Sequence, residues 1–134
     1  LDVCVAGTQG TIGYMVQQSL QNKLRDMDMD REVVTLVTQV IVDKNDPAIQ
    51  EPGLWRRVVP SPMPEYIMHG KSIKSLVDRG TILIATGGGG IPVYNDIHHL
   101  KGMDAVIDKD YTAAKLGRII RAEELWIITD VEYV

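Results

Sequence analysis

The sequence has little of several features that would place it in a specialised class of proteins. Cysteine occurs once, at Cys4, so no intramolecular disulfide can form, which is typical of a reducing compartment. No apolar run approaches the roughly 18 residues of a membrane-spanning helix, and no basic, apolar leader opens the chain. We therefore expect a cytoplasmic protein without a membrane partner. Cys4 is expected to be a small core residue rather than a nucleophile.

Basic residues are too few for a protein whose main partner is nucleic acid. The chain has 14 Lys and Arg against 18 Asp and Glu, with a formal net charge of −4. Binding to a phosphate backbone requires a positive surface, so we expect no nucleic-acid partner. The histidines have no cysteine partners nearby, and no metal site built from such ligands is predicted. What remains is a chain of 134 residues, 45% hydrophobic and 24% charged, which is an ordinary globular composition.

Apolar periodicity divides the chain into alternating helices and strands. Helical spacing predicts helices over 10–25 (capped by hydroxyls of 8–11), 72–79 and 110–121 (capped by Asp110), and β-branched runs predict strands over 33–42, 81–86 and 125–129. Residues 43–64 are predicted as loop, and a short hairpin-like excursion is expected between 95 and 102. This order is typical of an α/β fold with the three strands parallel in one sheet.

Two segments after the predicted strands have the composition of a phosphate site. The strand 81–86 runs into four glycines, whose backbone N–H groups can approach a ligand with no Cβ in the way. A cluster of two aspartates around a lysine then precedes a predicted helix. Phosphoryl transfer needs donors that spread negative charge and a cation near the transferred group. The candidate residues are therefore Gly87, Gly88, Gly89, Gly90, Asp108, Lys109 and Asp110. The alternative is a glycine-rich turn plus a surface charge run.

Ligands of parallel sheets lie beyond the carboxyl ends of the strands. Three candidate segments follow predicted strands in this way: 43–46, 87–90, and Thr129 with Asp130. We therefore expect these three segments to meet at one edge of the sheet.

Six blocks of the sequence, in the same order, resemble the carbamate kinases of the amino-acid kinase family. They are Gly7-Thr-Gln-Gly-Thr-Ile-Gly-Tyr-Met, Val37-Thr-Gln-Val-Ile-Val-Asp-Lys-Asn-Asp-Pro, Trp55-Arg-Arg-Val-Val-Pro-Ser-Pro, Gly87-Gly-Gly-Gly-Ile-Pro-Val, Ala105-Val-Ile-Asp-Lys-Asp and Ile128-Thr-Asp-Val. The resemblance implies a three-layer αβα sandwich with a mainly parallel sheet. It also implies reversible phosphoryl transfer between carbamoyl phosphate and ADP, giving ATP and carbamate, with Mg²⁺, by a homodimer.

The resemblance also implies roles for single residues. Lys109 would neutralise charge on the transferring phosphoryl group, and Asp110 would orient the lysines around it. Asp108 is the alternative organising or metal-linked carboxylate. Thr129 and Asp130 fall in the nucleotide-side block, where a hydrogen-bonded strand end is the alternative. Pro60-Ser61-Pro62 either shapes the nucleotide rim or stiffens the loop, and capping of the helix is a compatible role for Asp110.

The chain also departs from the family pattern. Two glycine loops that hold phosphate and substrate, a protruding subdomain and two of three expected lysines are absent, and a segment is deleted in register near 51–54. We interpret 1–134 as one partial amino-acid kinase domain: a fragment, a deletion product, or a sequence that records only part of the protein. The 134-residue chain is expected to be inactive alone.

Two questions about function stay open at this point. A non-catalytic kinase-like binding or assembly protein, or another member of the amino-acid kinase family, is the alternative to carbamate kinase. A dinucleotide-binding protein is less favoured, because 87–90 lacks the spaced Gly-x-Gly-x-x-Gly pattern.

The predicted helix 10–25 mixes Tyr14, Met15, Gln17 and Gln18 with its apolar stripe, which suits a homodimer interface.

Overall fold

The computed structural model describes residues 1–50 and 59–128, in which helices and strands alternate along the chain. The elements in chain order are α1 (Asp2–Asp26), β1 (Val33–Thr35), β2 (Gln39–Val42), α2 (Pro47–Gln50), β3 (Pro64–Ile67), α3 (Gly70–Asp78), β4 (Ile82–Ile84), the 3₁₀ turn η1 (Gly87–Gly89), β5 (Ile91–Asp96), β6 (His99–Gly102) and α4 (Lys109–Ile120). The fold is therefore α/β, with a partial sheet.

The strands of the described residues form two small sheets. In the first, β1 and β4 are parallel, with Val33 opposite Ile82. In the second, the order is β3-β2-β5-β6, where β2 and β5 are parallel and the two outer pairings are antiparallel. The parallel pairs are β1 with β4 and β2 with β5. Strands β1, β2 and β4 lie in the predicted strand regions, and β5 follows the four glycines. The antiparallel pairs are those of β3 and β6.

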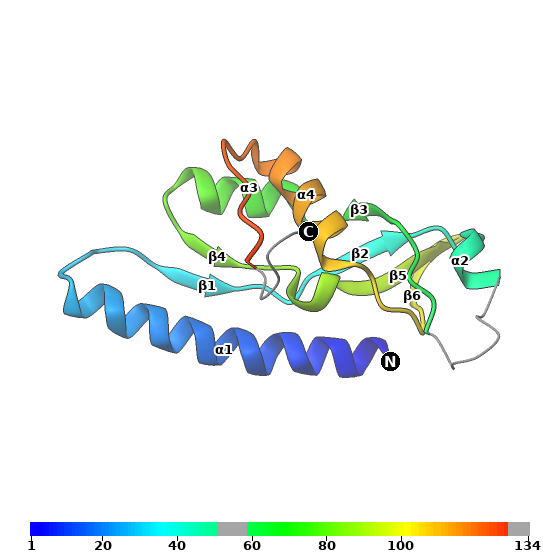
Figure 1. Cartoon of the computed structure of the whole chain (residues 1–134), viewed down its shortest axis with the longest axis horizontal. Coiled ribbons are helices and arrows are strands. Elements are labelled where there is room, and N and C mark those ends of the chain that lie inside the picture. The colour runs from blue at the N-terminus through cyan, green and yellow to red at the C-terminus, as the bar shows by residue number, and fades with distance from the viewer. Residues whose placement is uncertain (51–58, 129–134) are drawn as a thin grey trace.

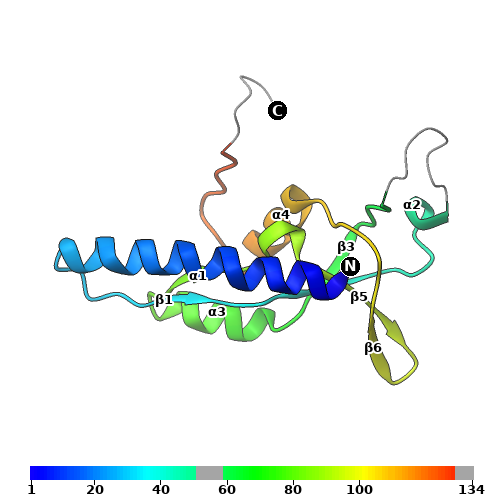
Figure 2. The ribbon, with the colours of Figure 1, turned by 90° about the horizontal axis from the view of Figure 1, so that it is seen from below.

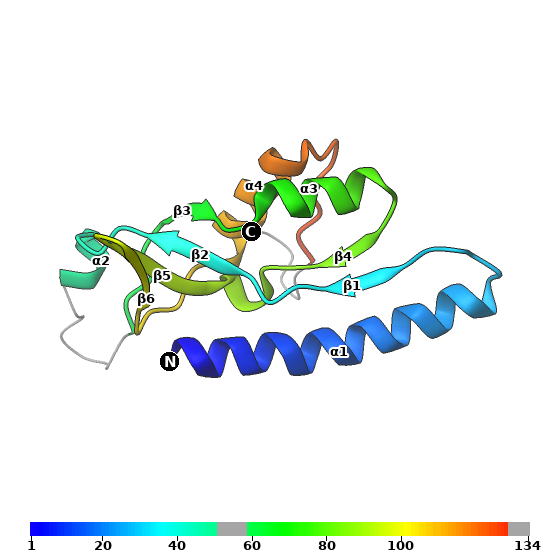
Figure 3. The same cartoon turned by 180° about the vertical axis from the view of Figure 1, so that it is seen from behind.

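The helices lie on both sides of these sheets and give three layers. Figure 1 shows α1 on one side of the strands, with α3 and α4 on the other, and Figure 3 shows the same order from behind. Figure 2 shows the hairpin of β5 and β6 extending away from α1. This arrangement agrees with the expected αβα sandwich.

The core lies between the four-stranded sheet and the helices α3 and α4. Its fully buried members come from β2, β3, α3 and the segment before α4: Val40, Val42, Ile67, Ile73 and Ile107. Partly buried side chains that pack against them include Leu83 of β4 and Leu116 of α4. Because Ile107 is anchored in this core, the next residues, Asp108 and Lys109, begin α4 at a fixed place beside the sheet.

Helix α1 packs with its polar side toward β1. Its buried positions include Gln9 and Gly13, and a Cβ on Gly13 would lie 2.2 Å from Thr35 Cγ2, so only glycine allows this approach. The Gln17 side chain accepts a hydrogen bond from Thr35 N at 3.0 Å, and Gln21 accepts one from Val33 N at 3.3 Å. The glutamines thereby satisfy N–H groups along β1 that no strand partner satisfies.

The prediction for the start of this helix was wrong, because α1 begins at Asp2 rather than near Gly10. The hydroxyls that were predicted to cap the helix instead donate to carbonyls one turn earlier. Thr8 donates to Cys4 O and Thr11 donates to Gly7 O, both at 2.9 Å. Such bonding is compatible with a helix interior, so hydroxyls alone did not mark the end. Cys4 is exposed on this helix and is not the core residue that we expected.

The predicted strand 33–42 is two strands in two sheets. Its partner β4 ends at Ile84 and turns into the glycines, so from Gln39 onward the chain takes β5 as its new partner. The apolar run suited both sheets and did not mark the exchange. The predicted loop 43–64 contains α2 and ends at β3, and residues 51–58, which include the expected deletion, lie outside the described residues.

The expected strand over 125–129 is not present in its described part. Residues 125–128 form no ladder, and the Trp126 and Ile128 side chains are exposed. A β-branched run becomes a strand only where it finds a partner, and this one finds none among residues 1–50 and 59–128. Thr129 and Asp130 lie outside the described residues.

The two later helices confirm their predictions closely. Helix α3 ends at Asp78 and is followed by Gly80 with φ of +85°, the left-handed conformation that glycine adopts easily. Helix α4 covers nearly the predicted span, but its cap is Asp108, whose carboxylate accepts from Asp110 N at 2.8 Å. Asp110 is therefore in the first turn and does not cap the helix. Among the described residues, no helix is long and apolar enough to span a membrane.

Candidate functional site

The glycine segment and the Asp108-Lys109 segment line one cavity. This cavity has a volume of about 330 Å³. Its walls come from three stretches of chain: Ser61; Gly88; and Val106, Ile107, Asp108 and Lys109. The structure thus places side by side two candidate segments about twenty residues apart in the sequence.

The four glycines form a tight turn, which we call the glycine loop (residues 87–90), and three of them have positive φ. The φ angles are +65° at Gly88, +92° at Gly89 and +96° at Gly90, and Thr86 before them is also left-handed at +54°. Non-glycine residues rarely adopt such angles, because the Cβ is crowded by the backbone. The backbone conformation of the loop therefore favours glycine at residues 88, 89 and 90.

The glycines differ in what surrounds them. A Cβ on Gly89 would lie 2.1 Å from the Ile107 carbonyl oxygen, and one on Gly90 would lie 2.3 Å from Val40 Cγ2. Around Gly88, in contrast, there is no atom within 4 Å of the added Cβ position. Gly89 and Gly90 are thus needed for close packing, whereas Gly88 faces the open space of the cavity.

Buried polar side chains hold the glycine loop on two sides. From α1, the Gln9 amide donates to Gly87 O at 2.8 Å, and its oxygen accepts from Thr38 N at 2.8 Å. The Thr38 hydroxyl in turn accepts from Thr86 N at 3.2 Å. From α4, the Thr112 hydroxyl lies 2.9 Å from Gly89 O and 3.2 Å from Asp108 O.

These polar side chains were not among the site residues predicted from the sequence. Gln9 and Thr38 lie within blocks that resemble the family, and this membership was the signal that could have identified them as site residues. Thr112 is one turn before Leu116 on the predicted helix, which makes it a polar residue on an otherwise apolar face. A buried polar side chain needs a partner, and this need was the signal that could have identified Thr112.

The acidic and basic side chains at the start of α4 have different surroundings. Asp108 uses one carboxylate oxygen to cap the helix, and its side chain lies at the cavity. Lys109 Nζ is 3.3 Å from the Asp110 carboxylate, and the lysine side chain is 72% exposed. Lys109 is thus a movable cation at the rim of the cavity, with Asp110 as its neighbour.

Ser61 reaches the cavity from the loop that precedes β3. The backbone of this loop is tied to the segment before α4, because Val106 N donates to Pro60 O at 3.0 Å. Of the residues Pro60-Ser61-Pro62, Ser61 lines the cavity and Pro62 is fully buried. The loop therefore both stiffens this region and contributes to the cavity wall.

The segment 43–46 lies elsewhere, and its expected place beside the glycine loop was wrong. Because the chain changes sheets after Leu36, the segment next to the glycine loop is Leu36–Thr38, with Ile91 N donating to Thr38 O at 2.8 Å. Residues 43–46 follow β2, at the end of the second sheet where β5 and β6 form their turn. There the Lys101 ammonium hydrogen-bonds the Asp96 carboxylate, which lowers the pKa of Asp96 below its ordinary value.

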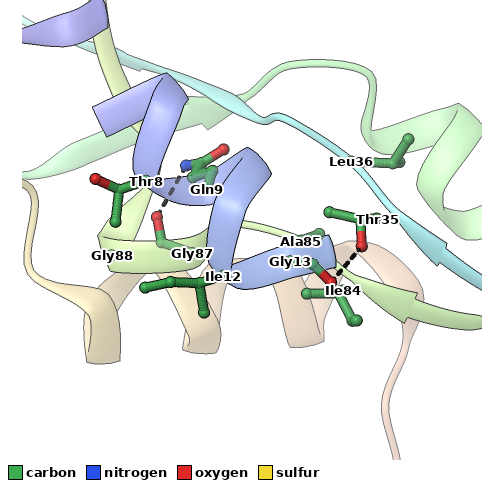
Figure 4. A pocket seen from close by; sticks show the side chains of 10 residues that line it. All are labelled: Thr8, Gln9, Ile12, Gly13, Thr35, Leu36, Ile84, Ala85, Gly87 and Gly88. Carbon is green, nitrogen blue, oxygen red and sulfur yellow. Dashed lines mark hydrogen bonds between the residues drawn. The ribbon is translucent and has the colours of Figure 1, made fainter. Parts of the chain in front are cut away.

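A second cavity, of about 160 Å³, lies on the other side of the glycine loop and is mostly apolar. Figure 4 shows Gln9 pointing toward Gly87, and the Thr35 hydroxyl bonded to Gly13 O. The lining residues are Thr8, Gln9, Ile12, Gly13, Thr35, Leu36, Ile84, Ala85, Gly87 and Gly88. No charged side chain lines this cavity, in contrast to the cavity at Asp108 and Lys109.

The donor set of the first cavity fits Mg²⁺ only in combination with phosphate oxygens. Among residues 1–50 and 59–128 there is no group of three His, Cys, Asp or Glu side chains that could hold an ion. Asp108 retains a carboxylate oxygen that is not used by the helix cap. Mg²⁺ is usually bound by one or two carboxylates together with substrate phosphates, and Asp108 satisfies that requirement.

Comparison with known sequences finds one family over most of the chain. A model described as the amino acid kinase family matches residues 8–134. The carbamate kinase of Pyrococcus furiosus is 44% identical over 160 residues, covering 98% of this chain and 51% of the relative. That of Staphylococcus epidermidis is 46% identical over 161 residues, covering 98% and 52%.

Solved structures give the same result. A carbamate kinase from Giardia lamblia bound to AMP-PNP matches with a TM-score of 0.90 at 41% identity, covering 97% of this chain and 45% of that one. A protein from Aeropyrum pernix matches with a TM-score of 0.90 at 29% identity, covering 99% and 52%. The chain spans about half the length of the curated relatives that it matches.

Proposed function

This chain belongs to the amino acid kinase family, and we propose that the protein catalyses reversible phosphoryl transfer between carbamoyl phosphate and ADP. The products are ATP and carbamate. The observation that supports this proposal most strongly is the cavity in which the glycine loop meets Asp108 and Lys109. The similarity to carbamate kinases, one of them solved with AMP-PNP, favours this substrate pair among the reactions of the family.

The glycine loop supplies backbone to the phosphates in this proposal. Gly88 has open space at its Cβ position and lines the cavity, so a phosphate can approach its backbone closely. Gly87, Gly89 and Gly90 hold the loop in shape around it. Thr129 and Asp130 are proposed to contribute on the nucleotide side.

Lys109 is the proposed cation for the transferred group. Charge on the equatorial phosphoryl oxygens is redistributed in the transition state, and a positioned ammonium stabilises it there. Asp110, whose carboxylate is 3.3 Å from Lys109 Nζ, restrains the lysine and does not act as a base. Because the lysine is exposed and mobile, it can follow the phosphoryl group between the two substrates.

Asp108 is the proposed carboxylate for Mg²⁺ when the nucleotide is bound. The ion would neutralise phosphate charge and orient the nucleotide. Asp108 itself keeps α4 capped, so the helix start and the carboxylate are fixed by the same contact.

The protein is further proposed to be a cytoplasmic homodimer. The outward side of α1 supports association, because Tyr14 and Met15 are 65% and 61% exposed. Exposed apolar side chains on one helix suit an interface better than solvent. Sedimentation of the native protein, as it is expressed from its own gene, tests this: a monomer at micromolar concentration would rule out the dimer.

Additional segments are proposed to be needed for turnover, with a deletion near 51–54 relative to the family. The alignment with the Pyrococcus enzyme runs over 160 residues although this chain has 134, which supports an internal length difference. Intact mass spectrometry of the native protein would reveal any additional segments. For this reason the activity experiments below use the native protein.

The substrate proposal is tested by measuring ATP formation from ADP with two acyl phosphates. We expect ATP with carbamoyl phosphate and little with acetyl phosphate, which lacks the amino group. ATP formation with acetyl phosphate alone would assign the protein to a different acyl phosphate. Binding of ADP without turnover of either compound would favour the non-catalytic alternative.

A further inference from the structure

We propose that Gln9 and Thr112 are positioning residues that hold the glycine loop in the conformation in which Gly88 faces the cavity of Lys109. This inference rests on the proposed function of the loop. It concerns two side chains that line no wall of the Lys109 cavity and reach the loop from opposite layers of the fold.

The glycine loop needs restraint because glycine gives it freedom. Glycine populates many backbone conformations, so a run of four has a large entropic cost of ordering. Within the described loop the backbone hydrogen bonds are two turn contacts, Gly89 N to Thr86 O at 3.0 Å and Gly90 N to Gly87 O at 3.3 Å. Contacts from outside the loop must therefore select its single conformation.

Gln9 provides the contact from α1. Its amide group links the loop to the segment between β1 and β2, since it donates to Gly87 O and accepts from Thr38 N, each at 2.8 Å. The residue is buried, so both bonds form away from bulk water. A buried amide with both ends bonded is costly to disturb, which fixes the beginning of the loop.

Thr112 provides the contact from α4. Its side chain is fully buried, and its hydroxyl oxygen lies 2.9 Å from Gly89 O and 3.2 Å from Asp108 O. The contact thereby joins the end of the loop to the residue that caps α4 beside Lys109. Removal of the hydroxyl would delete this hydrogen bond between the glycine loop and α4, while the packing of Gly89 against Ile107 would stay.

Together, Gln9 and Thr112 hold the glycine loop at a fixed position relative to the start of α4, where Lys109 lies. Gln9 holds Gly87, Thr112 holds Gly89, and Gly88 between them is left with open space toward the cavity. The anchored glycines are the ones next to Gly88, and Gly88 itself is the one that faces the cavity.

The test uses variants that remove the hydrogen bonds while keeping size. Thr112→Val keeps the branched shape without the hydroxyl, and Thr112→Ser restores it. Gln9→Met keeps length and helix propensity without the amide. Thr11→Val and Gln18→Met, at exposed positions of α1, are the matched controls. Each substitution is made in the native protein, and amide hydrogen exchange is measured on peptides that cover residues 85–92.

We expect Thr112→Val and Gln9→Met each to speed exchange of the loop amides about tenfold, equivalent to about 1.4 kcal/mol of lost protection. Thr112→Ser and both controls should exchange like the unsubstituted protein. Unchanged loop exchange in both Thr112→Val and Gln9→Met would overturn the proposal. If one of the two fails to fold, the other decides.

Nucleotide affinity separates this inference from the proposed function. AMP-PNP should bind about tenfold more weakly to Thr112→Val than to Thr112→Ser, because ordering the loop then costs binding energy. Equal affinity of the two variants, with their loop exchange different, would overturn the positioning role. Failure of AMP-PNP to slow loop exchange in the unsubstituted protein would overturn the proposed function of the loop, whereas faster loop exchange in Thr112→Val would still support the contacts proposed here.

Discussion

At the scale of single residues, three of the four glycines of the loop are favoured for two different reasons. Gly89 and Gly90 are small because the Ile107 carbonyl and the Val40 side chain occupy the space of a Cβ. Gly88 is free of such neighbours and has positive φ next to the cavity. Substitutions at these positions should therefore have separable effects on stability and on ligand binding.

Gly89→Ala should destabilise the protein more than Gly88→Ala. Both substitutions force alanine into a left-handed conformation, at a cost of about 1–2 kcal/mol. Gly89→Ala also creates a clash with the backbone at Ile107. Such overpacking lowers the free energy of unfolding by about 1–3 kcal/mol more. Urea unfolding of both variants measures the difference. Equal unfolding midpoints would show that the loop does not pack against Ile107 as described.

The two roles of Asp108 can be separated by a pair of substitutions. Asn caps helices about as well as Asp, so Asp108→Asn should unfold like the unsubstituted protein, whereas Asp108→Ala should lose about 1 kcal/mol. Both remove the carboxylate from the cavity and should slow phosphoryl transfer about tenfold or more. Rates at saturating ADP and varied Mg²⁺ measure the second effect. Full activity of Asp108→Asn would leave capping as the only role of this residue.

At the scale of the elements, α1 is unusual in facing β1 with glutamines and a glycine. Gln17 and Gln21 accept hydrogen bonds from backbone N–H groups of β1, and Gly13 lets the helix approach Thr35. The apolar side chains of Tyr14 and Met15 are exposed on the other side of the helix. Apolar periodicity correctly predicted that this segment is a helix, but it indicated the opposite face as the one packed in this chain.

Gln17→Leu should destabilise the packing of α1 on β1. The substitution leaves Thr35 N without its acceptor in a partly buried position, which costs about 1–3 kcal/mol. Gln18→Leu is the control, because Gln18 is exposed and bonds only to Asn22. Thermal unfolding of both variants decides the matter: equal losses would contradict the edge contacts of α1.

The hairpin of β5 and β6 should have a measurable pH dependence. Lys101 lowers the pKa of Asp96 by a hydrogen bond and by its charge, so this pair stabilises the hairpin above the ordinary pKa of Asp. That contribution is lost as pH falls through the lowered value, and it is small because both groups are exposed. In Lys101→Met, NMR titration should give Asp96 its ordinary pKa. An unchanged pKa would exclude the ion pair.

At the scale of the whole molecule, the site depends on which segments the sheets bring together. The sequence indicated the glycine loop, the aspartates and the lysine as candidates, because phosphoryl transfer needs backbone donors and a cation, and Gly88, Asp108 and Lys109 line one cavity. It did not predict that the chain changes sheets between Thr35 and Gln39, which places Thr38 rather than residues 43–46 beside the loop. Strand partners depend on contacts between distant residues, and the β-branched run 33–42 does not by itself show where the partner changes.

The most direct test of the account is the rate of ATP formation from carbamoyl phosphate and ADP by the native protein with and without Lys109. Lys109→Ala should lower kcat about a hundredfold, on the order of 3 kcal/mol, with ADP binding much less affected. Asp110→Asn should behave similarly, because the lysine then loses its restraint. Lys74→Ala, a lysine of α3 paired with Asp78, is the matched control and should leave the rate unchanged. Undiminished ATP formation by Lys109→Ala would contradict the account.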